Sequence, residues 1–212
     1  MIVITADQVD SRSTPDAAAG ALEHLNSDPS IRLLLPADRT AGDEIQMLAA
    51  SGPDALAIIL RLTRSRRWSV GCGIGAVREP LPASVRESSG DAFVAARVAV
   101  DRSKKRPTRF ALKSAPDQAP GTDAEAILDL LLAIRDRRSD EGWELYDLLA
   151  AGLTQADAAA RLGITPQAAS KRAKAAELRA EEAVLDPLAR LIARADTEVA
   201  REVDNHGREV QS

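Results

Sequence analysis

Short apolar runs and longer segments of helical spacing alternate along the first half of the chain. The apolar runs predict strands at residues 1–6, 31–35, 44–48, 68–77 and 108–113. Apolar positions with a helical period predict helices at 53–63 and 91–103, and Ser13-Thr14-Pro15-Asp16 is typical of a helix start. The segment 36–42, which begins with Pro and ends with Gly, predicts a hairpin connection.

The order of these elements, β-α-β-β-α-β-α-β, predicts an α+β domain over residues 1–114. Such a domain has a mostly antiparallel sheet with helices packed on one face. Residues 115–122 contain two Pro and one Gly and predict a linker. Only helical patterns follow, so we expect an all-α domain over 123–204 and a flexible tail at 205–212.

Two apolar patterns in the second half predict buried helix faces. The broad apolar face of residues 124–134 predicts a helix in the core of the helical domain. Asp186-Pro187 is typical of another helix start. The stripe that follows it fits either ordinary core or a dimer seam. Its members are Leu188, Leu191, Ile192, Ala195 and Val199.

Residues 153–174 predict a helix-turn-helix unit. Thr154 is a cap for a first short helix, and Gly163 supplies the left-handed conformation that ends it. Thr165 and Pro166 are a cap and a first helical residue for the second helix. The segment resembles sigma-factor-like and other bacterial regulatory helix-turn-helix units.

The second helix of this unit has the arrangement of a recognition helix, whose polar residues enter the major groove. We expect Gln167 and Lys171 to read bases, and Arg172 and Lys174 to hold phosphates. The expected DNA-binding residues are Thr165, Gln167, Ser170, Lys171, Arg172 and Lys174. The alternative is a helical hairpin with a solvated basic face, which contacts proteins or nothing.

Composition adds constraints on partners and location. The net charge of −4 argues against a protein coated in nucleic acid but leaves room for a local basic face. Cys72 is the single cysteine, so no intrachain disulfide forms, which fits a reducing compartment. The first residues lack a signal-peptide pattern, and no run approaches the ~20 apolar residues of a membrane span. We therefore expect a cytoplasmic protein without a membrane partner.

Polar segments at the expected strand ends carry a family resemblance. They are Asp7 with Asp10-Ser11-Arg12, Gly42-Asp43-Glu44-Ile45-Gln46, Gly73-Ile74-Gly75, and Gly90-Asp91-Ala92-Phe93 with Ala96-Arg97. In this order and spacing the chain resembles the SatD family over nearly its whole length. The resemblance implies a ferredoxin-like, cyclase-like palm followed by a helix-turn-helix domain. The first half is more distantly similar to class III nucleotidyl cyclases and diguanylate cyclases.

The resemblance also implies a site. Asp7 and Asp43 match the two carboxylates that clamp a pair of Mg²⁺ ions against a nucleoside triphosphate in cyclase palms, so they are the implied metal ligands. The implied nucleotide-binding residues are Asp7, Asp10, Ser11, Arg12, Asp43, Glu44 and Arg97. The acidic residues beside Gly42 also fit an ordinary hairpin turn.

Departures from the cyclase pattern make binding a stronger expectation than catalysis. Phe93 stands where class III cyclases have an Asn, and the single Gly42 precedes the acidic pair where diguanylate cyclases have two glycines. The sequence thus predicts a dimeric DNA-binding transcriptional regulator whose palm binds a nucleotide, with or without Mg²⁺, or mediates dimerisation. The alternatives are a metal-dependent cyclase-like enzyme using Asp7 and Asp43, and a protein-binding adaptor.

Overall fold

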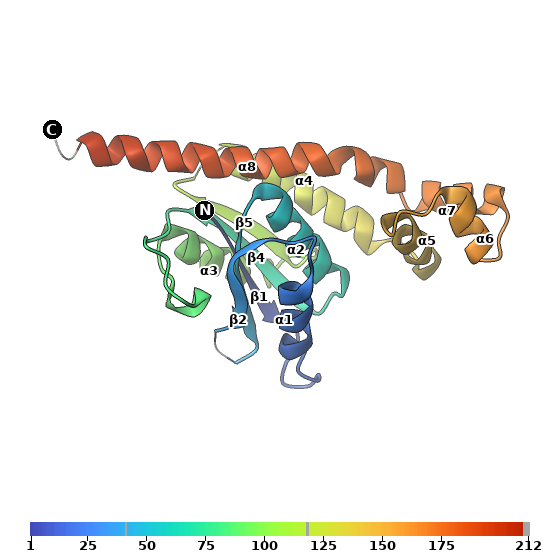
Figure 1. Ribbon diagram of the computed structural model, residues 1–212, viewed down its shortest axis with the longest axis horizontal. Coiled ribbons are helices and arrows are strands. Elements are labelled where there is room, and N and C mark those ends of the chain that lie inside the picture. Colours follow the sequence, from blue (N-terminus) through green and yellow to red (C-terminus); the bar gives the residue numbers. More distant parts are fainter. Residues whose placement is uncertain (41, 118, 210–212) are drawn as a thin grey trace.

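A five-stranded mixed sheet lies at the centre of the part of the chain that the computed structural model describes, residues 1–40, 42–117 and 119–209 (Figure 1). Its strands are β1 (Ile2–Gln8), β2 (Leu33–Arg39), β3 (Glu44–Ala49), β4 (Trp68–Gly75) and β5 (Phe110–Ala115). Their order across the sheet is β2-β3-β1-β4-β5. β5 runs parallel to β4, and the other neighbouring strands are antiparallel. The expected α+β class and mostly antiparallel sheet are confirmed.

Helices cover both faces of this sheet, whereas the sequence predicted one covered face. One face carries α1 (Ala18–Ser27), α2 (Gly52–Arg64), α4 (Ala119–Asp136) and α8 (Leu178–Glu209). The other face carries α3 (Asp91–Ser103), against which Val3 and Leu48 pack. The strands present buried apolar residues to both faces, so each face has to be covered.

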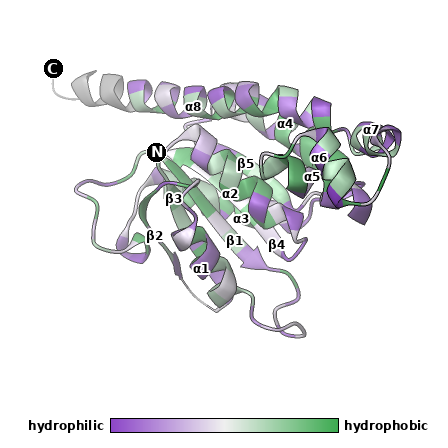
Figure 2. Cartoon of the chain, turned by 45° about the vertical axis from the view of Figure 1, so that its right-hand side comes forward, coloured by the Kyte–Doolittle hydropathy of each residue, from purple (hydrophilic) through white to green (hydrophobic). Residues whose placement is uncertain are grey.

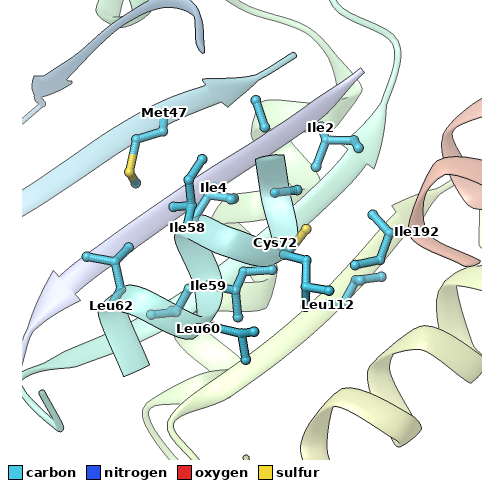
Figure 3. Close-up of a cluster of buried hydrophobic side chains, with 14 of the residues drawn as sticks. Ile2, Ile4, Met47, Ile58, Ile59, Leu60, Leu62, Cys72, Leu112 and Ile192 are labelled. Carbon is cyan, nitrogen blue, oxygen red and sulfur yellow. The ribbon is translucent and has the colours of Figure 1, made fainter. Parts of the chain in front are cut away.

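The larger core lies between the sheet and α1, α2, α4 and α8 (Figure 3). Its labelled members are Ile2, Ile4, Met47, Ile58, Ile59, Leu60, Leu62, Cys72, Leu112 and Ile192. Burial raises the pKa of the Cys72 thiol to about 12, so this cysteine stays protonated and acts as a small apolar side chain.

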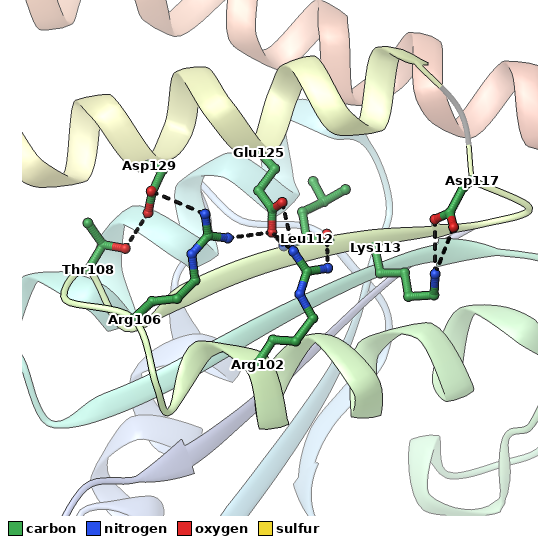
Figure 4. Close-up of polar contacts among 8 residues, drawn as sticks. All are labelled: Arg102, Arg106, Thr108, Leu112, Lys113, Asp117, Glu125 and Asp129. Carbon is green, nitrogen blue, oxygen red and sulfur yellow. Dashed lines mark hydrogen bonds and ion pairs between the residues drawn. The ribbon is translucent and has the colours of Figure 1, made fainter.

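The helix predicted for residues 124–134 belongs to this sheet rather than to a separate helical domain. Its Leu128 is buried in the same core as the sheet residues. Glu125 also accepts hydrogen bonds from Arg106 Nη1, at 2.7 Å, and from the Leu112 backbone N–H, at 2.8 Å (Figure 4). α4 therefore covers β5, which is one of the two edge strands of the sheet. α4 begins at Ala119, inside the predicted linker 115–122, whose Gln118 lies outside the described residues.

α8 also corrects the expected division of the chain. It runs as one helix through Pro187, where the sequence predicted a new start. Pro187 has no N–H to donate, which costs one helical hydrogen bond. The buried stripe on both sides, with Leu188 and Ile192, holds the helix on the sheet. That stripe is core within this chain, which decides between the two interpretations offered for it.

The hydropathy of α8 alternates along its length, as expected for a helix with one face on the core (Figure 2). Part of the predicted tail 205–212 is helical, because α8 continues to Glu209; residues 210–212 lie outside the described residues. None of the helices described combines the length and apolar character needed to cross a membrane.

The first helix starts later than predicted. α1 begins at Ala18 rather than near Ser13. The Gln8 side chain accepts from the Ala17 N–H at 2.8 Å and donates to Thr14 Oγ1 at 2.9 Å. These bonds hold the segment before α1 as a loop, so the local helix-start pattern is overridden.

The second strand extends through Pro36, which was expected to lie in a connection. β2 continues to Arg39, with irregular register between Leu35 and Asp38. β2 is an edge strand, where a missing N–H and a bulge are tolerated. The turn to β3 is correspondingly short.

Candidate functional site

Three short helices, α5 (Asp140–Ala150), α6 (Gln155–Arg161) and α7 (Pro166–Ala175), form a group at one end of the molecule (Figure 1). The predicted caps are present. Thr154 accepts from the Asp157 N–H at 3.2 Å, and Thr165 accepts from the Ala168 N–H at 3.2 Å. Gly163 has a φ of +65°, which ends α6 and directs the chain into α7.

Small residues allow α6 and α7 to approach each other closely. Ala158 and Ala159 of α6 are buried, as is Ala169 of α7. Leu145 of α5 is fully buried beneath them. α7 is thus held along one side, while its other side remains in solvent.

The solvent side of α7 gathers four of the six predicted DNA-binding residues. Gln167, Ser170, Lys171 and Lys174 are exposed, and we call them the α7 face. α7 contains no acidic residue. Residues 153–180 hold five basic and two acidic residues, a net charge of +3, whereas the whole chain carries −4.

The other two predicted residues have different roles in the structure. Thr165 is exposed, but its hydroxyl accepts the Ala168 N–H as the cap of α7. Arg172 lies half-buried, with Nη1 3.7 Å from Glu144 Oε2 of α5. Arg172 lies two residues before Lys174, so the two side chains point about 160° apart around the helix axis. Its expected phosphate contact is therefore not supported by its position.

The predicted carboxylates meet where β1 ends and β3 begins. Asp7 pairs with Glu44 in the antiparallel register, and the Gln8 N–H donates to the Asp43 carbonyl at 3.4 Å. The Asp7 carboxylate accepts from Lys104 Nζ at 2.9 Å. The Glu44 carboxylate pairs with Arg97 and accepts from Thr40 Oγ1 at 2.7 Å. Asp7, Glu44, Lys104 and Arg97 thus form what we call the carboxylate cluster, and the nucleotide-binding role expected for Asp7, Glu44 and Arg97 stays a prediction.

Lys104 is the member of this cluster that the sequence did not indicate. Partial burial alone would lower its pKa, but hydrogen bonds and charge attraction from Asp7 and Asp101 raise the pKa overall. Lys104 therefore remains charged against Asp7. Basic residues are common at the ends of helices, where they interact favourably with the helix dipole. The position of Lys104 in the sequence therefore gave no sign that it would pair with Asp7.

The remaining predicted nucleotide ligands lie apart from the carboxylates. Asp10, Ser11 and Arg12 are in the loop after β1, with Asp10 in the left-handed conformation at φ +53°. The Asp10 carbonyl accepts from the backbone N–H groups of Ser13 and Thr14. Within the described residues, none of the three side chains forms an ion pair with the cluster.

Among the described residues, no larger group of ligands supports the implied Mg²⁺ site. Across residues 1–40, 42–117 and 119–209, no group of three or more His, Cys, Asp or Glu side chains is placed to hold a metal. Asp7 and Glu44 are each neutralised by a cation of this chain. The metal-binding role implied for Asp7 and Asp43 stays a prediction, with Asp7 already paired with Lys104.

Comparisons with known proteins assign no family to the chain. No protein-family model, curated protein or solved structure matches it. The resemblance to the SatD family therefore stands on the motifs of the sequence.

Proposed function

We propose that the protein is a DNA-binding transcriptional regulator of the SatD type, in which α6 and α7 form a helix-turn-helix and α7 is the recognition helix. The observation that carries this proposal is the α7 face, which is exposed, basic and free of acidic residues. Two side-chain caps and buried alanines hold it rigidly, which suits insertion into a major groove.

The topology supports the palm part of the resemblance. The path β1-α1-β2-β3-α2-β4, with strand order β2-β3-β1-β4 and antiparallel neighbours, is the ferredoxin-like arrangement. α3 and the parallel strand β5 extend it. We infer that this palm binds a nucleotide or mediates homodimerisation, in a protein of the cytoplasm. Pairing would match the two half-sites that such regulators read.

The cyclase alternative has less support than DNA binding. A two-metal reaction needs free carboxylates, whereas Asp7, one of the two carboxylates that it would use, is paired with Lys104. The adaptor alternative uses the α7 face against a protein, and the experiment below separates it from DNA binding.

Replacing the two lysines of the α7 face is expected to weaken DNA binding and reduce its salt dependence. The Lys171→Ala/Lys174→Ala double variant should lose roughly ten-fold in affinity at ~0.1 M salt, because one base-reading and one phosphate-holding cation are removed. The slope of log K against log salt should fall in magnitude by about 1, because Lys174 is the phosphate contact of the pair. Fluorescence anisotropy measures both, with one mixed-sequence duplex and one fragment from upstream of the protein's own gene.

The matched control removes two exposed cations elsewhere, in Lys105→Ala/Arg137→Ala. This variant should keep both the affinity and the slope of the wild-type protein. Equal binding by the folded Lys171→Ala/Lys174→Ala variant contradicts the assignment of α7. If the wild-type protein binds neither duplex at low salt, the adaptor function replaces DNA binding.

A further inference from the structure

A cavity lined by arginines lies between the sheet body and the group α5–α7. Its volume is about 280 Å³, and it opens where the ends of α2 and α4 meet the segment before β5 and the start of α5. Arg64, Arg66, Arg109 and Arg135 line it. Asp136 is the single acidic residue among the described residues that line it.

The four arginines have unequal partners. Arg64 is bound by both oxygens of Asp147, at 2.6 and 2.7 Å. Arg66 Nε lies 2.7 Å from the Asp136 carboxylate. Arg109 has no carboxylate within ion-pair distance among the described residues, and its Nη1 is 3.4 Å from Ser69 Oγ.

Two buried arginines beside the cavity share a single carboxylate. Arg135 and Arg138, 5% and 6% exposed, share the one carboxylate of Glu181, which is 2% exposed. Arg135 Nε and Arg138 Nη1 are buried without a hydrogen-bond partner. Buried donors of this kind are costly unless another group accepts from them.

An aromatic ring, Trp143, also contacts three of these arginines. The guanidinium carbons of Arg64, Arg135 and Arg138 lie 4.3, 4.8 and 4.4 Å from the centroid of the Trp143 ring. Such cation–π contacts offset some of the cost of desolvating the cations but supply no negative charge. Counting Arg66 and Arg109, five guanidinium groups face three carboxylates here.

We propose that this cavity binds the phosphate group of a small phosphorylated molecule. The planar guanidinium fork matches phosphate oxygens, and Arg109, without a carboxylate, and Arg66, paired at the surface, are the contacts. The cavity size suits a phosphate group with a small attached moiety. The bound anion would supply the negative charge that the cluster lacks.

Binding of a ligand in this cavity would be coupled to the position of α7 relative to the sheet. Arg138, behind the cavity, donates to the Ala176 carbonyl at 3.1 and 2.9 Å, directly after α7. The ligand therefore lies beside the contacts that fix the α5–α7 group. This binding site is separate from the carboxylate cluster and does not depend on DNA binding.

Titration calorimetry of the full chain tests the proposal with inorganic phosphate, pyrophosphate and adenosine monophosphate, without Mg²⁺. We expect at least one of them to bind with a stoichiometry near one per chain. Arg66→Gln/Arg109→Gln should weaken that binding by roughly ten-fold or more, because two charge-assisted contacts are lost. Comparison of the three probes separates a free anion from a phosphate ester as the ligand.

Two further variants make the result decisive. Arg137→Gln removes an exposed charge next to the cavity without lining it, and should bind as the wild type does. Asp43→Asn changes a residue of the nucleotide site that the family resemblance implies, and should also leave binding unchanged. The proposal is overturned if no probe binds, if the folded Arg66→Gln/Arg109→Gln variant binds normally, or if Asp43→Asn alone abolishes binding.

Discussion

Replacing Glu181 by Gln is expected to destabilise the protein by about 3–5 kcal/mol, the largest effect of any single charge removal proposed for this chain. Glu181 is the one carboxylate that neutralises Arg135 and Arg138, and all three side chains are buried. Without it, two desolvated cations face each other with no anion between them. For a chain of this length the loss corresponds to a fall in Tm of roughly 6–20 °C, measured by calorimetry.

The neighbouring residue provides the control. Glu182 is exposed, and Glu182→Gln should change the free energy of unfolding by less than about 0.5 kcal/mol. Hydrogen exchange should show α5–α7 losing protection first in Glu181→Gln, because the cluster joins these helices to α4 and α8. A stability of Glu181→Gln equal to that of Glu182→Gln would contradict the argument.

Local chemistry explains what the sequence predicted well. The order of strands and helices in the first half, the caps at Thr154 and Thr165 and the turn at Gly163 agree with the structure. Each of these features is set by residues within a few positions of one another. The meeting of Asp7 with Glu44 was also predictable, because a resemblance supplied the pairing of the two segments.

The features that the sequence did not predict depend on contacts between residues far apart in the chain. Arg135 and Glu181 are separated by 46 positions, and Lys104 and Asp7 by 97. Nothing in the charged run that follows residue 134 indicates that Arg135 is buried. Apolar stripes on α4 and α8 showed that a face is buried, but not that it packs on the sheet.

The alternate glycines of β4 illustrate the same limit. They form the surface on which α3 lies. A Cβ on Gly73 would be 2.2 Å from both Ala92 O and Ala96 N of α3. A Cβ on Gly71 would be 2.2 Å from Val100 N. The absence of side chains therefore sets the distance between α3 and the sheet.

Gly73→Ala is accordingly expected to destabilise the protein by about 3 kcal/mol, at the upper end of overpacking effects. The atoms that it meets are backbone atoms of α3, which yield only if the whole helix moves. Gly20→Ala is the matched substitution, because a Cβ there meets nothing within 4 Å and Gly20 lies inside α1. It should stabilise the protein by up to about 1 kcal/mol through helix propensity. Urea unfolding of both variants measures the two opposite signs.

The same substitution should reach the carboxylate cluster. α3 carries Arg97, and Lys104 follows its last residue, so a shift of α3 away from β4 moves both cations from Glu44 and Asp7. Nuclear magnetic resonance signals of the Lys104 ammonium and Arg97 guanidinium groups should then move towards those of unpaired side chains. If Gly73→Ala keeps both the stability and the Lys104 and Arg97 side-chain signals of the wild type, the close approach of α3 does not position this cluster.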